Sequence, residues 1–158
     1  MSSPQKAIMW FRQDLRLHDN PALLKAIESD RFFPIFIIDD ENAGKWRMGA
    51  ASKVWLHHAL VDLNKQLNGQ LSIFKGKADD IIAKLVKEQG IDAVYWNRCY
   101  EPWRIKRDSK LKESLAQEAN IEVKTFNASL LWEPWEIAKS DGTPYRVFTP
   151  FYKKGCLN

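Results

Sequence analysis

Short apolar runs alternate with longer mixed segments along the first 126 residues of the chain. The runs are AIMWF, RFFPIFIID, LSIF, DAVYWN and IEVKTF, which begin at residues 7, 31, 71, 92 and 121. Runs of this length bounded by polar residues are typical of buried strands in a parallel sheet. In the second run, Pro34 favours a position at the start of the strand, because proline cannot donate to a sheet ladder.

The segments between these runs predict helices. Asn20 and Pro21 suit the N-cap and the first position of a helix that runs to about Asp30. A long helix is predicted to begin at Ala50, with an apolar face of four leucines at the helical period: Leu56, Leu60, Leu63 and Leu67. Further helices are predicted over 78–89, with Gly90 just past the end, and over 102–119, whereas ENAGKWRMG (41–49) predicts a polar loop.

Five strands joined by four crossovers predict an α/β fold with a doubly wound, Rossmann-like parallel sheet and helices on both faces. Reversal of the winding between the first and fourth strands gives the strand order 3-2-1-4-5. We assign residues 1–128 to this domain. Residues 129–158 have neither helical nor strand period and contain three prolines. They predict an extended segment that leads toward further structure.

Composition narrows the class of protein only slightly. A 158-residue chain that is 45% hydrophobic and 28% charged is typical of a soluble globular domain. With no apolar run of membrane-spanning length and no signal-peptide pattern, we expect a cytoplasmic protein without a membrane partner. The net charge of +4 favours nucleic acid only weakly, and Cys99 and Cys156 are too few for a disulfide framework or a zinc site.

Candidate ligand-binding residues follow the strands, because doubly wound sheets bind ligands beyond their carboxyl ends. The first strand leads into WFRQDLRLHDNPAL, and the fourth leads into NRCYEPW. At the strand ends these loops supply Arg12, Asn97, Arg98 and Glu101, which we expect to converge on one crevice if the two strands are neighbours. Asp39 borders this crevice from the second strand. For Arg12 and Arg98, a ligand role and a structural role both remain open.

The other charges of the first loop have a simpler interpretation. Asp14 and Arg16 are expected to form ion pairs within the loop, and Asp19 is expected to support the start of the following helix. If Arg12 instead faces a ligand, Arg12→Ala should weaken binding and leave the melting temperature nearly unchanged.

Common catalytic motifs are absent from the sequence. There is no G-x-G-x-x-G and no G-x-S-x-G, and in GKWRMGAAS the lysine and hydroxyl of a phosphate-binding loop are replaced by Ala50 and Ala51. His57 and His58 are adjacent, so they project about 100° apart on a helix and are expected to be structural. Cys99 has no evident general base nearby in the sequence. We therefore predict no catalytic residue.

One family resemblance runs along nearly the whole chain. The segments WFRQDLRLHDNPAL, FPIFIID, GAASKVWLHHALVDLNKQL, IFKG, VYWNRCYEPW and PYRVFTPFYK resemble, in colinear order, the N-terminal α/β domain of DNA photolyases and cryptochromes. In that family this domain carries a light-harvesting antenna chromophore. A C-terminal helical domain, which has no counterpart here, holds the catalytic FAD and binds DNA. The resemblance implies light-driven repair of cyclobutane pyrimidine dimers by the full-length protein, and no repair by these residues alone.

The resemblance also implies which residues hold the antenna. The folate type places Asn and Glu at the positions of Trp103 and Arg104, so WNRCYEP favours a deazaflavin or a flavin (FMN or FAD) over folate. The residues carried over for that chromophore are Arg12, Ile38, Asp39, Ser52, Arg98 and Glu101, and we add Asn97 and Lys53. Lys53 follows Ser52 where that type has an arginine, whose bidentate contact lysine does not reproduce.

Two other functions remain as alternatives. The same domain of a cryptochrome photoreceptor fits the sequence equally well, whereas an independent nucleotide-binding module of the universal-stress type would need a phosphate-binding glycine pattern. A domain that docks against a partner is expected to expose apolar residues when it is alone. The candidates lie in the tail, where they could cause self-association: Trp132, Trp135, Phe148, Phe151 and Tyr152.

Overall fold

The computed structural model describes residues 6–117 and 121–157. The chain divides into two compact units, Met1–Ala128 and Ser129–Asn158. The first unit contains the predicted sheet, and it is the unit that forms the candidate site.

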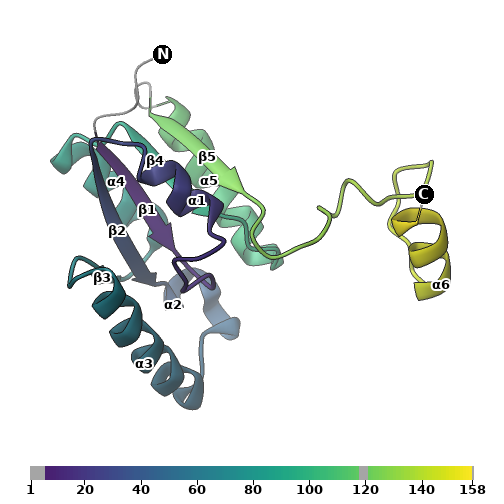
Figure 1. The fold of residues 1–158 in the computed structure, drawn as a ribbon, viewed down its shortest axis with the longest axis horizontal. Helices are drawn as coiled ribbons and strands as arrows, with labels where there is room; N and C mark the ends of the chain where they lie inside the picture. Colours follow the sequence, from purple (N-terminus) through teal and green to yellow (C-terminus); the bar gives the residue numbers. More distant parts are fainter. Residues whose placement is uncertain (1–5, 118–120, 158) are drawn as a thin grey trace. The chain divides into compact units, whose positions relative to one another are not determined.

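Five parallel strands form the sheet of the first unit in the order β3-β2-β1-β4-β5 (Figure 1). The strands are β1 (Lys6–Phe11), β2 (Arg31–Ile38), β3 (Ser72–Lys75), β4 (Ala93–Asn97) and β5 (Glu122–Phe126). Phe11 pairs with Phe36, and β2 continues for two residues to Ile38, which pairs with Lys75. The predicted fold class and strand order are confirmed.

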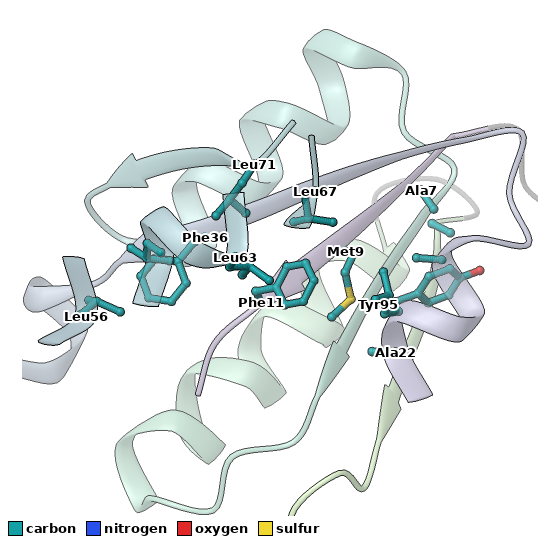
Figure 2. Packing of buried hydrophobic residues seen from close by; sticks show 14 residues of the cluster. Ala7, Met9, Phe11, Ala22, Phe36, Leu56, Leu63, Leu67, Leu71 and Tyr95 are labelled. Atoms are coloured by element: carbon teal, nitrogen blue, oxygen red, sulfur yellow. The ribbon is translucent and has the colours of Figure 1, made fainter. Parts of the chain in front are cut away.

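Helices cover both faces of this sheet. They are α1 (Pro21–Ala26), α3 (Ala50–Gln66), α4 (Ala78–Gln89) and α5 (Pro102–Gln117). Successive residues of β1 point to opposite faces of the sheet, so the side chains that pack against them show which face each helix covers. Met9 and Phe11 pack in one cluster with side chains of α1 and α3, as Figure 2 shows for part of that cluster. Ile8 and Trp10 pack in the other cluster with α4 and α5.

Local capping explains where the helices begin and end. The side chain of Asn20 accepts a hydrogen bond from the Leu23 amide at 3.1 Å, with Pro21 as the first helical residue, as predicted. Gly90 takes the left-handed conformation at the end of α4, with φ of 58°. The predicted leucine face of α3 is buried, Leu67 included.

Three details of the sequence prediction are wrong. Helix α1 ends at Ala26, where turns replace the predicted last residues. The predicted polar loop at 41–49 instead contains most of α2 (Asp40–Ala43) and the 3₁₀ helix η1 (Gly44–Trp46), because Asp39 caps the Asn42 amide at 3.0 Å. Pro34 is the fourth residue of β2, and it is tolerated there because pairing with β3 begins only at Ile35. The predicted end of the last helix, at Ala119, lies outside the described residues.

The second unit is not extended throughout. It ends in a helical turn, α6 (Phe148–Pro150), followed by the π-helical η2 (Phe151–Cys156). Within this unit the rings of Phe148 and Tyr152 stack with centroids 5.7 Å apart, and Phe151 meets Tyr145 edge to face. Phe148 and Tyr152 are four residues apart, so their stack follows the helical period, a local signal that the prediction of an extended segment did not use. Of the tail aromatics, Trp132, Trp135, Phe148 and Tyr152 are exposed and Phe151 is half-buried.

Among the described residues, no helix is both long and apolar enough to span a bilayer. Cys99 and Cys156 are free thiols, and the described part of the chain contains no cluster of His, Cys, Asp and Glu suited to a metal ion.

Candidate chromophore-binding cavity

A cavity of about 1050 Å³ lies at the carboxyl edge of the sheet, within the first unit. Its walls come from the ends of β1, β2 and β3, from α2 and η1, from one side of α3 and from the first turns of α5. Pockets for organic ligands have volumes of several hundred to about a thousand Å³ and are mostly apolar. This cavity lies where doubly wound sheets bind their ligands.

Six of the predicted site residues line this cavity: Arg12, Ile38, Asp39, Ser52, Lys53 and Glu101. They come from four separate stretches of sequence, and the fold brings them together. The other two, Asn97 and Arg98, are not part of the lining. Convergence of the two loops on one crevice therefore holds for Arg12 and Glu101 only.

Asn97 faces the start of α1 rather than the cavity. Its side-chain amide donates to Asp14 Oδ2 at 2.5 Å and to Asn20 Oδ1 at 2.7 Å, and its oxygen accepts from the Ala22 amide at 3.2 Å. Asp14 Oδ1 accepts in turn from the Arg12 amide at 2.8 Å. Asn97, Asp14 and Asn20 are all buried. Their hydrogen bonds satisfy groups that would otherwise be costly to bury, so we assign Asn97 a structural role.

Arg98 is directed to the neighbouring strand. Its guanidinium donates to the carbonyl and the hydroxyl of Thr125 on β5, at 2.7 and 3.0 Å. Its amide donates to the Phe126 carbonyl at 2.8 Å. The residue thus secures the edge of the sheet.

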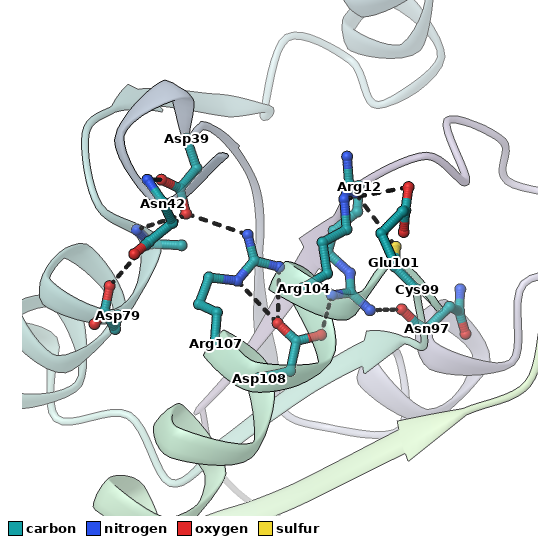
Figure 3. Close-up of polar contacts among 11 residues, drawn as sticks. Arg12, Asp39, Asn42, Asp79, Asn97, Cys99, Glu101, Arg104, Arg107 and Asp108 are labelled. Atoms are coloured by element: carbon teal, nitrogen blue, oxygen red, sulfur yellow. Dashed lines mark hydrogen bonds and ion pairs between the residues drawn. The ribbon is translucent and has the colours of Figure 1, made fainter. Parts of the chain in front are cut away.

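Arg12 lines the cavity but already has partners. One guanidinium nitrogen pairs with Asp108 on α5, and the other donates to the Asn97 carbonyl (Figure 3). Only 3% of its side chain is exposed. Its charge is therefore balanced inside the protein before any ligand binds.

Arg107 is the central cation of the site, and the sequence analysis did not identify it. It pairs with Asp39 at 3.2 Å and with Asp108 at 2.7 Å, and its side chain is 5% exposed (Figure 3). Its guanidinium lies over the rings of Trp10 and Trp103, at 4.7 and 5.1 Å from their centroids. It therefore links β1, the end of β2 and α5.

The signal for Arg107 was present in the sequence as spacing. Glu101, Arg104 and Arg107 recur every three residues at the start of a predicted helix, so they share one side of it. In the structure all three line the cavity, and Arg104 pairs with Glu101 at 3.5 Å. The spacing does not indicate that Arg107 pairs with Asp39, which lies on another element.

The remaining charges of the first loop hold its backbone. Arg16 donates to the carbonyls of His18, Asp19 and Ala128 at 3.1, 2.9 and 2.8 Å. Asp19 has a φ of 49°, and its side chain is almost fully exposed. The predicted ion pairs within the loop are found for Arg16, which lies 3.9 Å from Asp19 Oδ2, but not for Asp14, whose carboxylate accepts from amide groups instead.

Indole rings dominate the aromatic part of the lining: Trp10, Trp46, Trp55 and Trp103. Trp46 and Trp55 are each 70% exposed, whereas Trp10 is buried. Trp10 Nε1 and Arg12 Nε are buried donors without a hydrogen-bond partner in the described part of the chain, and both belong to lining residues. Flat apolar walls suit a planar aromatic ligand.

Fold and cavity together define a doubly wound α/β domain with a cavity at the carboxyl edge of its sheet, where sheets of this kind bind their ligands. Comparison with known proteins gives the family. Residues 7–158 match the model of the DNA photolyase family, and the chain belongs to that family as an N-terminal domain.

The relatives include both photolyases and cryptochromes. The chain is 41% identical over 150 residues to a deoxyribodipyrimidine photo-lyase of Agrobacterium fabrum, covering 92% of this chain and 30% of that protein. It is 37% identical to cryptochrome-2 of Arabidopsis thaliana, covering 100% of this chain and 26% of that protein. The chain thus spans less than a third of the length of these two relatives.

Solved structures agree with this assignment. The fold matches the crystal structure of a class III photolyase from Agrobacterium tumefaciens with a TM-score of 0.85 and 36% identity, over 97% of this chain and 32% of that one. It matches an archaeal photolyase from Sulfolobus tokodaii with a TM-score of 0.73 and 27% identity, over 97% of this chain and 35% of that one.

Proposed function

We propose that residues 1–128 are the light-harvesting domain of a DNA photolyase and bind an antenna chromophore in the cavity described above. When bound, the chromophore supplies absorption of light and transfer of the excitation energy to a catalytic FAD held by a C-terminal domain. The chain's own residues bind and orient the chromophore. The observation that carries the proposal is a cavity with aromatic walls at the carboxyl edge of a sheet of this family.

A deazaflavin or a flavin is the proposed chromophore. Trp103 and Arg104 stand where the folate type has Asn and Glu, and Trp103 lines the cavity together with three other tryptophans. The Sulfolobus tokodaii photolyase contains two FAD molecules, with the implication of a novel light-harvesting cofactor. That relative supports a second flavin as a member of the candidate class here.

We propose that Arg12, Ile38, Asp39, Ser52, Lys53 and Glu101 form part of the chromophore site. Lys53 is held by Asp40 at 2.6 Å and Arg12 by Asp108, so both act from fixed positions. Asn97 and Arg98 are removed from the candidate ligand contacts, because their side chains bond to the loop after β1 and to β5.

Light-driven repair of pyrimidine dimers is proposed for the longer protein, with DNA and the FAD domain as partners and residues 129–158 as the connection to that domain. The 158 residues alone are expected not to repair DNA. A cryptochrome photoreceptor is the alternative, favoured by identity to plant cryptochrome-2 nearly as high as to the photolyase. Repair of dimer-containing DNA by the longer protein under blue light distinguishes the two.

Chromophore binding is tested by titrating the chain with FMN, FAD, a deazaflavin and a folate, and following the absorption and emission of each. The expected result is saturable binding of a flavin or deazaflavin. Val61→Trp, which adds bulk to a lining residue of α3, should abolish it. Val54→Trp is the matched control, because Val54 is an exposed residue of the same helix outside the lining. Binding that survives Val61→Trp would place the ligand elsewhere.

A further inference from the structure

The cationic side chains that line the cavity differ in whether they have a carboxylate partner. Five lining side chains are cationic: Arg12, Lys53, Lys75, Arg104 and Arg107. Four of the five are in ion pairs with carboxylates, as described above: Arg12 with Asp108, Lys53 with Asp40, Arg104 with Glu101, and Arg107 with Asp39 and Asp108. A cation already paired with a carboxylate gains less from an anionic ligand, because the ligand competes with that carboxylate.

Lys75 is the exception among these five. It is the last residue of the edge strand β3 and pairs in register with Ile38, which also lines the cavity. No carboxylate of the described residues lies within ion-pair distance of its ammonium group. The side chain is exposed, so it enters solvent or the open end of the cavity without burying an unpaired charge.

Polar side chains of α3 also line the cavity. Alongside Lys75, β3 contributes Ile73, and α3 contributes His57 and Asn64. His57 and Asn64 carry hydrogen-bonding side chains, whereas the tryptophans come from β1, η1, α5 and the first turns of α3. The lining therefore offers aromatic walls and, from β3, one unmatched positive charge.

We propose that Lys75 forms an anion subsite of the cavity and binds the phosphate ester of the chromophore's side chain. The inference rests on the proposed function and specifies which chromophores the cavity prefers. A phosphate monoester carries a charge of about −1.5 to −2 at pH 7, which a lysine ammonium group binds well as a point charge. The subsite selects a chromophore with a phosphorylated tail over the same ring with a neutral tail.

Riboflavin and FMN test this directly, because they share one ring and differ only in the phosphate. In fluorescence titrations of the 158-residue chain at low salt, FMN should bind roughly three- to tenfold more tightly than riboflavin, the range of a partly exposed charge-assisted contact. Lys75→Met should reduce FMN affinity to that of riboflavin and leave riboflavin affinity unchanged. Lys75→Arg should keep the preference.

Lys77→Met is the matched control, because Lys77 is two residues away and is not part of the lining. This variant has the same net charge as Lys75→Met and should keep the FMN preference. Added salt should narrow the preference of the unaltered chain and have no effect on Lys75→Met.

Equal affinity of the unaltered chain for the two ligands, or a preference that persists in Lys75→Met, overturns the subsite and leaves the proposed function standing. If neither flavin binds while a deazaflavin or a folate does, the subsite for a flavin phosphate is wrong and the light-harvesting role survives. If no chromophore binds, both fall.

Discussion

At the scale of single residues, the two arginines of the site illustrate how partners decide a role. Arg12 and Arg107 both contact Asp108, and both lie near the ring of Trp10, at 5.1 and 4.7 Å. Each guanidinium is nearly fully buried and meets a carboxylate, so neither presents a free charge to a ligand. They shape the cavity and hold its wall.

Arg12→Ala is accordingly expected to destabilise the domain, in contrast to the prediction from sequence. Without Arg12, Asp108 keeps only Arg107, which also pairs with Asp39, so the buried cluster carries one net negative charge and the change costs about 3 kcal/mol. Urea denaturation followed by far-UV circular dichroism measures the loss. Arg47→Ala, at an exposed arginine, is the control and should change stability by less than about 0.5 kcal/mol. Unchanged stability combined with lost chromophore binding would return Arg12 to a direct ligand role.

At the scale of elements, the pairing of β4 with β5 carries a polar contact between two residues that do not line the cavity, in addition to the Arg98–Thr125 hydrogen bonds. The Tyr95 hydroxyl donates to Glu122 Oε1 at 3.0 Å, while the Tyr95 ring lies in the core. Burial raises the pKa of this phenol above its ordinary value, and the bond to Glu122 raises it further. The pKa of Glu122 is lowered, first by Lys124 and then by the Tyr95 hydroxyl.

Stability should therefore fall in alkali in a way that depends on Tyr95. A phenol whose pKa is higher in the folded state stabilises the fold fully below its unfolded pKa of about 10, and that contribution is lost as the pH rises further. Urea midpoints measured between about pH 8 and pH 11 should fall less steeply for Tyr95→Phe than for the unaltered chain. At pH 8 the variant should lose about 1 kcal/mol, the value of one hydrogen bond. Parallel pH curves for the two proteins would exclude Tyr95 as the group responsible.

At the scale of the whole chain, everything that builds the cavity belongs to the first unit. Its lining lies between residues 10 and 107, and both hydrophobic clusters lie between residues 7 and 126. The last residue of the unit, Ala128, accepts a hydrogen bond from Arg16, so the boundary itself is tied to the first loop.

Residues 1–128 alone are expected to fold and to bind the same chromophore. The shortened chain keeps every residue of the two hydrophobic clusters and of the cavity lining. Its Kd for the chromophore should therefore agree with that of the 158-residue chain within about twofold, which is less than about 0.5 kcal/mol of binding free energy. Comparing the two titrations, with unfolding curves as the control for folding, measures this. A shortened chain that folds but no longer binds would mean that residues after Ala128 complete the site.

Self-association through the exposed tail aromatics stays a prediction, and it should disappear in the shortened chain.

The sequence by itself determined the strands, most helix positions and their layering. These depend on neighbours within a few residues: the alternation of Met9 with Ile8 and Trp10, the leucine period of α3, and the Asn20 cap. The strand order 3-2-1-4-5 is that of a doubly wound sheet with one reversal of the winding, between the first and fourth strands.

Only the tertiary structure decided which charged side chains face the cavity and which are already satisfied. Arg12 and Asp108 are 96 positions apart, and Asn97 lies 83 positions from Asp14. No local pattern records such pairs, because their energy depends on burial and distance that exist only after the sheet has formed. Lys75 became distinctive for the same reason: unlike the four other cations of the lining, it has no carboxylate of the described residues within ion-pair distance.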